Sequence, residues 1–62
     1  MLELYKKVLR GVSFDRILFK KELVKATKWV GKKDLSRLKV WCIATYGAVH
    51  GQIIEEVFNQ IQ

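Results

Sequence analysis

The chain has 62 residues, contains no proline and has a single cysteine, Cys42. That cysteine has no partner for an internal disulfide, and no Cys and His residues have the spacing of a zinc site. No segment approaches the ~20 consecutive apolar residues that a membrane-spanning helix needs. Repeats, low-complexity tracts and linkers are also missing. These absences predict one small domain over residues 1–62, with no metal, no cofactor and no membrane span.

The beginning of the chain also lacks the features of a secretion signal. MLELYKKVLRGV is interrupted by charge every few residues and has no continuous apolar core. A lone cysteine fits a reducing compartment. We therefore expect a cytoplasmic protein.

Basic residues are missing from the last part of the chain. Residues 40–62 carry only Glu55 and Glu56, a net charge of −2, whereas residues 1–39 carry all 12 Lys and Arg against four carboxylates, a net charge of +8. The two parts together give the overall charge of +6. This asymmetry is the strongest functional signal in the sequence, because a cluster of bases attracts phosphates.

Half of the residues are hydrophobic, and they recur at helical spacing in four segments. We predict an all-α bundle of three to four short helices, at about 2–10, 14–30, 35–46 and 49–60. Gly11 should break the first helix, Asp34 should cap the third, and Gly47 should end it. The predicted core consists of Leu9, Phe19, Leu23, Val30, Leu38, Trp41, Ile54, Val57 and Phe58.

The segment 14–30 is the predicted spine of the bundle. Its apolar seam, completed by Ala26, is typical of a helix laid on a partner. Ser13 or Asp15 can cap its start, and Gly31 should end it in a left-handed conformation. The segment from Phe14 to Phe19 is apolar nearly all round, so we expect other elements to cover its first turns.

Lysines form a stripe on the opposite side of this segment. If the first two helices pack side by side, their bases could share one face that binds nucleic acid phosphates. Trp29 lies beside this stripe, where it can stack on a base, fill a partner's pocket or pack against the protein itself. The predicted nucleic-acid-binding residues are Lys6, Lys7, Arg10, Lys21, Lys25, Lys28, Lys32 and Lys33. The alternative is that these lysines are only a solvated surface.

A second hypothesis is a protein-protein interaction or self-assembling, dimeric module without any role for nucleic acid. Val40 and Ile43 fall outside the apolar stripe of their helix, and we predict that they form a partner interface. The last helix is acidic and has the apolar stripe His50, Ile53, Ile54, Val57, Phe58 and Ile61, so opposite charges could also pair between copies.

Other functions find less support in the sequence. A helix-turn-helix over residues 35–58 would place Glu55 and Glu56 against DNA phosphates with no base to offset them. A membrane-surface role for the basic helix would use the apolar seam that the small core also needs. Cys42 and His50 each lie on an apolar stripe, where an inert thiol and a core-edge or interface histidine are expected. We therefore expect no enzymatic activity and no small-molecule substrate.

Overall fold

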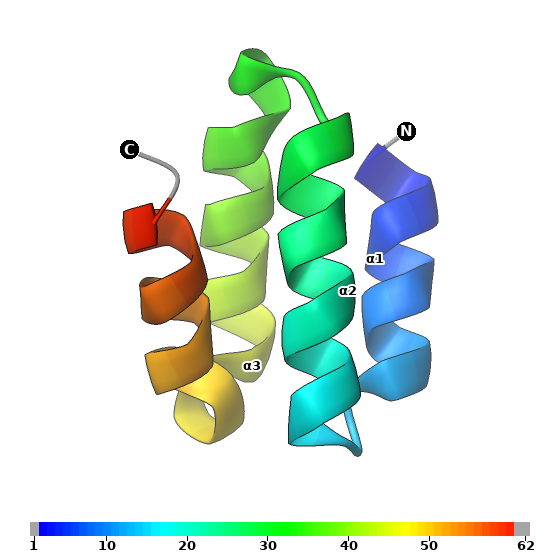
Figure 1. The fold of residues 1–62 in the computed structure, drawn as a ribbon, viewed down its shortest axis with the longest axis vertical. Coiled ribbons are helices and arrows are strands. Elements are labelled where there is room, and N and C mark those ends of the chain that lie inside the picture. Colours follow the sequence, from blue (N-terminus) through cyan, green and yellow to red (C-terminus); the bar gives the residue numbers. More distant parts are fainter. Residues whose placement is uncertain (1, 61–62) are drawn as a thin grey trace.

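The computed structural model describes residues 2–60, and over this range the protein is an all-α bundle of three helices, α1 (Leu2–Val12), α2 (Arg16–Trp29) and α3 (Lys32–Gln60). Helix α2 packs against both α1 and α3, as expected for the spine. Helix α3 is bent back on itself, so its two halves and the other two helices surround one core (Figure 1). The predicted residue Ile61 lies outside the described residues.

The predicted third and fourth helices are continuous, which corrects the expected stop at Gly47. The only non-helical backbone inside α3 is at His50, with φ −117° and ψ 22°. Glycine within a helix costs only about 1 kcal/mol relative to alanine, so neighbouring contacts can override it. The bend falls instead where the His50 side chain is held by other elements. Gly11 likewise does not break α1, which continues to Val12.

The start of α2 is capped by Asp15 and not by Ser13. The Asp15 carboxylate accepts hydrogen bonds from the backbone N–H of Ile17 at 2.9 Å and of Leu18 at 3.1 Å. Ser13 serves the preceding helix, because its hydroxyl donates to the carbonyl oxygen of Arg10 at 3.0 Å. Each residue thus satisfies backbone groups that a helix end leaves without partners.

The connection between α2 and α3 differs from the prediction at both helix ends. The α2 helix ends at Trp29 with an extended Val30, and no described glycine has a positive φ. The Gly31 carbonyl accepts from the N–H of Asp34 at 2.9 Å and of Leu35 at 3.1 Å. Asp34 therefore lies in the first turn of α3 and does not precede it, a position that also suits a carboxylate because of the helix dipole.

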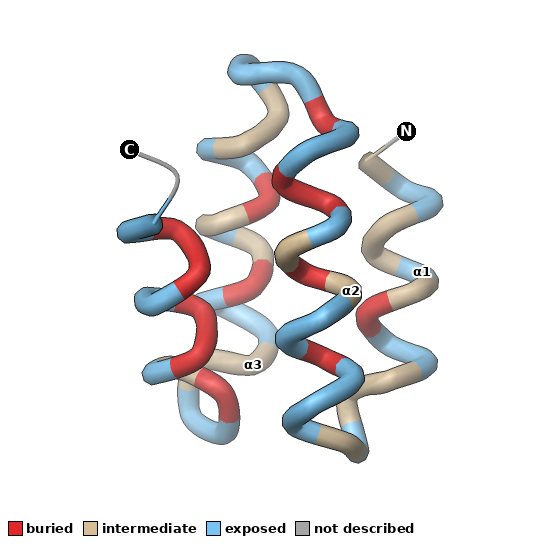
Figure 2. Tube along the Cα trace, in the orientation of Figure 1, coloured by how far each residue is buried: buried red, intermediate tan, exposed pale blue. Residues whose placement is uncertain are grey.

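The core follows the predicted seams closely (Figure 2). All nine predicted core residues except Trp41 are buried, and Trp41 is partly buried and packed against the core. Cys42 and His50 are buried too, as expected from their apolar stripes. The expectation that the first turns of α2 are covered is wrong. Phe14, Ile17 and Leu18 are exposed, and only Phe19 of that segment is buried.

Candidate functional site: a lysine face and an exposed tryptophan on α2

The outward side of α2 carries Lys21, Lys25 and Lys28. These residues are exposed and lie opposite the seam that buries Phe19 and Leu23. One carboxylate approaches them, that of Glu22, which is 3.9 Å from the Nζ atom of Lys25. An exposed pair at this separation contributes little, so the charge of Lys25 remains available to an anion.

Trp29 ends α2 with its side chain in solvent. The residue is 65% exposed, and Lys28 beside it, Lys25 one turn earlier, and Lys32 and Lys33 in the first turn of α3 are exposed as well. A large aromatic side chain at an exposed site among cations is the combination that binds phosphates and stacks on bases. We refer to Lys21, Lys25, Lys28, Trp29, Lys32 and Lys33 as the α2 face.

The bases of α1 are arranged differently from the prediction. The Nζ atom of Lys6 and the Cζ atom of Arg10 each lie 5.7 Å from the centroid of a Trp41 ring on α3. These two residues therefore turn toward α3, where they cover a partly buried indole, and do not extend the stripe of Lys21, Lys25 and Lys28. The expected single face across α1 and α2 is divided into two groups.

Trp41 is held from several sides by the protein itself. Its ring meets the Tyr46 ring edge-on, with centroids 5.7 Å apart. Cation–π contacts with Lys6 and Arg10 complete the arrangement, and each contributes roughly 0.5–1 kcal/mol at an exposed site. Lys7 is exposed and takes no part in this cluster. Lys6 and Arg10 thus have an aromatic partner within the protein, and no such cation–π contact is formed by the described lysines of the α2 face.

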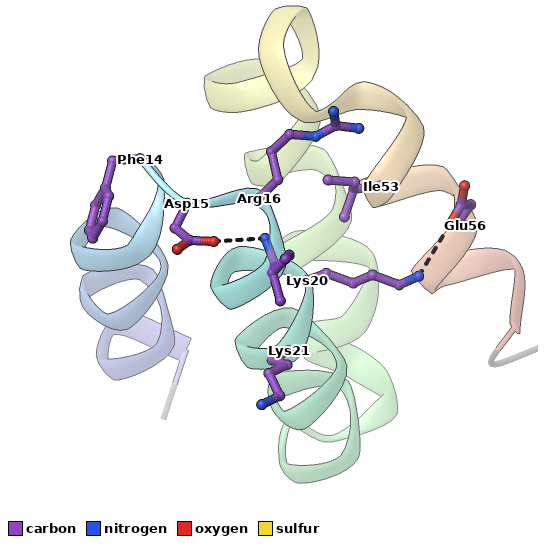
Figure 3. Close-up of a pocket in the computed structure, with 8 residues that line it drawn as sticks. Phe14, Asp15, Arg16, Lys20, Lys21, Ile53 and Glu56 are labelled. Carbon is purple, nitrogen blue, oxygen red and sulfur yellow. Dashed lines mark hydrogen bonds and ion pairs between the residues drawn. The ribbon is translucent and has the colours of Figure 1, made fainter.

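A shallow hollow of about 740 Å³ lies beside the start of α2, against the second half of α3. Arg16, Lys20 and Lys21 line it together with Phe14, Ile17 and Ile53 (Figure 3). Lys20 reaches across to Glu56, with 3.4 Å between Nζ and a carboxylate oxygen. The sequence prediction omitted Phe14, Ile17 and Arg16. Ile17 shares the helical face of Lys21, four residues on, and this spacing could have placed it on the exposed side.

Cys42 and His50 are both buried in the core. No group of three or more His, Cys, Asp or Glu residues in the described part of the chain is arranged to hold a metal ion. Burial raises the pKa of the Cys42 thiol to about 12, so the thiol stays protonated. The His50 ring is stacked on Phe19 with centroids 4.4 Å apart and serves the packing.

Comparisons with protein-family models, curated proteins and solved structures find no match to this chain. None of the helices over residues 2–60 has the length and apolarity needed to cross a membrane. The functional argument accordingly rests on the arrangement of side chains.

Proposed function

We propose that this protein is a small nucleic-acid-binding module that contacts phosphates through the α2 face. The observation that carries the proposal is the exposed Trp29 among Lys25, Lys28, Lys32 and Lys33. An indole this exposed contributes little to folding, whereas it offers a stacking surface to a base. Lysines on both sides of it suit the phosphates that flank such a base.

The charge of the chain supports the same proposal. Long-range attraction by a net charge of +6 favours encounter with a polyanion and weakens as salt rises. The α2 face is built from side chains of two helices joined by a tight connection, so its cations are held on a rigid support. Binding of this kind recognises the backbone and carries little sequence information.

A salt-dependent titration tests the proposal. The anisotropy of a labelled mixed-sequence oligonucleotide is measured with the wild type and with Lys25→Gln/Lys28→Gln, at several salt concentrations. We expect salt-sensitive binding by the wild type, and a shallower salt dependence for the variant by roughly one unit of slope per lost phosphate contact. The matched control is Arg37→Gln/Lys39→Gln, which removes the same charge from α3 and should retain the wild-type slope to within about half a unit.

The two variants distinguish binding through the α2 face from attraction by net charge alone. Equal weakening by both variants would mean that net charge alone attracts the oligonucleotide, and the proposed face would be abandoned. Absence of wild-type binding at low salt would remove the nucleic acid function itself.

A second candidate function is self-association or protein binding through α3. Val40 is 67% exposed and Ile43 is 46% exposed, and no Lys, Arg, Asp or Glu occurs from residue 40 to residue 54. An uncharged exposed helix face of this kind is common in protein interfaces. Sedimentation of the wild type and of Val40→Lys/Ile43→Lys tests it. A concentration-dependent dimer that the variant abolishes supports the interface, whereas a wild-type monomer at high concentration removes the homodimer.

A further inference from the structure

The three most exposed large apolar side chains in residues 2–60 all lie at one end of the bundle. Phe14 is 81% exposed, and Ile17 and Val49 are each 73% exposed. Phe14 belongs to the turn between α1 and α2, Ile17 to the first turn of α2, and Val49 to the bend of α3. Figure 1 shows that this turn and this bend lie at the same end, opposite the connection that follows Trp29. We name Phe14, Ile17 and Val49 the apolar tip.

A hydrogen bond holds the two loops of the tip together. The His50 Nε2 atom lies 2.7 Å from the carbonyl oxygen of Ser13. His50 is buried, with only 3% of its surface exposed. Ser13 directly precedes Phe14, and His50 directly follows Val49. The bond therefore fixes the positions of two tip residues that are distant in sequence.

Positive charge outweighs negative charge beside Phe14 and Ile17. Arg16, Lys20 and Lys21 line the hollow there, together with the carboxylates of Asp15 and Glu56. Glu56 pairs with Lys20, whereas Arg16 makes no ion pair with any residue described in the structure. In Figure 3 the Lys21 side chain points along α2 away from its start, so Arg16 is the free cation at this end. Apolar side chains beside a net positive charge complement an anionic lipid surface.

We propose that the apolar tip docks this protein on the surface of an anionic lipid bilayer. Phe14, Ile17 and Val49 enter the boundary between headgroups and acyl chains, and Arg16 contacts lipid phosphates. The inference does not depend on nucleic acid binding, because none of these four residues belongs to the α2 face.

A second copy of the chain fits the tip less well than a bilayer does. In a two-fold symmetric dimer the same patch meets itself, so Arg16 would approach its own copy. Like charges in such contact oppose association. Three side chains also supply only a small part of the ~1,200 Å² that a stable interface buries.

Co-sedimentation with vesicles tests the proposal. The protein is mixed with vesicles of phosphatidylcholine alone or of phosphatidylcholine with phosphatidylglycerol, and the bound fraction is measured. We expect the wild type to bind the anionic vesicles, and Phe14→Ser/Ile17→Ser/Val49→Ser to bind them at least about tenfold more weakly. The control Leu4→Ser removes an exposed apolar side chain from α1 and should bind to within about twofold of the wild type.

A fluorescent reporter gives an independent reading of orientation. Phe14→Trp should show a blue shift of its added emission on anionic vesicles, because the new indole leaves water. Equal binding of the wild type to both kinds of vesicle, no binding to either, or equal loss in the triple variant and in Leu4→Ser would overturn the proposal. Sedimentation without lipid that shows dimers abolished by the tip substitutions would assign the tip to a second copy and would also overturn it.

Discussion

The two tryptophans of this protein show how similar surroundings lead to different roles. Both Trp29 and Trp41 have cations near them. Trp41 on α3 is half-buried, and Lys6 and Arg10 lie over its ring, so its neighbours are engaged within the protein. Trp29 is exposed, and no cation–π contact to it is formed among the described residues. A cation count alone therefore overstates a binding surface, because some cations already have aromatic partners in the fold.

The largest expected effect is the difference in protein stability between the alanine variants of the two tryptophans. Trp41→Ala should lower the free energy of unfolding by about 2–4 kcal/mol, since it removes a ring packed against the core and two cation–π contacts. Trp29→Ala should change it by no more than about 0.5 kcal/mol. Chemical denaturation followed by circular dichroism measures both. Equal losses would contradict the assigned difference in packing.

The bend of α3 provides the next test. His50→Leu places an apolar side chain in the position of the imidazole ring and removes the N–H donor to the Ser13 carbonyl. We therefore expect a loss of about 1–2 kcal/mol in unfolding free energy. The carbonyl of Ser13 is then left without its partner. The control Val49→Ala, one residue away and exposed, should change stability by less than about 0.5 kcal/mol. Denaturation midpoints that are the same for His50→Leu and the wild type would show that the hydrogen bond does not stabilise the bend.

The buried thiol gives a smaller, pH-dependent effect. The Cys42 pKa is raised from 9.0 to about 12 by burial, so between these values the unfolded chain releases a proton that the folded protein keeps. The free energy of unfolding is therefore unaffected by this thiol below pH ~9. Above that pH it falls by up to about 1.4 kcal/mol per pH unit as the pH rises. Because Lys and Tyr titrate in the same range, the measurement is the difference in slope between the wild type and Cys42→Ala. Identical slopes would contradict a protonated buried thiol.

The smallest expected effect concerns the surface cations themselves. Lys28→Gln on the α2 face should leave stability within about 0.5 kcal/mol of the wild type, because Lys28 makes no ion pair among the described residues. Lys6→Gln should cost about 0.5–1 kcal/mol, since it removes a cation from Trp41. Thermal melting at equal salt compares the two. A larger loss of stability for Lys28→Gln than for Lys6→Gln would contradict the conclusion that Lys6 stabilises the fold and that Lys28 does not.

Local sequence patterns were sufficient to predict the core of the bundle. The spacing of Phe19, Leu23 and Val30 identifies the buried side of α2, because burial follows helical period directly. The burial of Cys42 and His50 follows from the same reasoning. The exposed lysines of α2 are predictable too, since they lie opposite this seam.

Features that depend on contacts between helices could not be read from the sequence. The backbone of α3 bends at His50 and not at Gly47, because contacts with Ser13 and Phe19 outweigh the local preference of glycine. Lys6 and Arg10 were assigned to the face of α2, whereas the rotation of α1 in the bundle directs them to Trp41. Helical spacing fixes which residues share a side of one helix, but not which neighbour that side meets.

The most direct test of the difference between the tryptophans follows both indole N–H signals in one experiment. A two-dimensional NMR spectrum of the protein labelled with nitrogen-15 is recorded at low salt while an unlabelled oligonucleotide is added. The account predicts that the Trp29 indole signal shifts as the oligonucleotide binds and that the Trp41 signal stays in place. A shift of Trp41 without Trp29, or no shift of either, would contradict the α2 face as the binding surface.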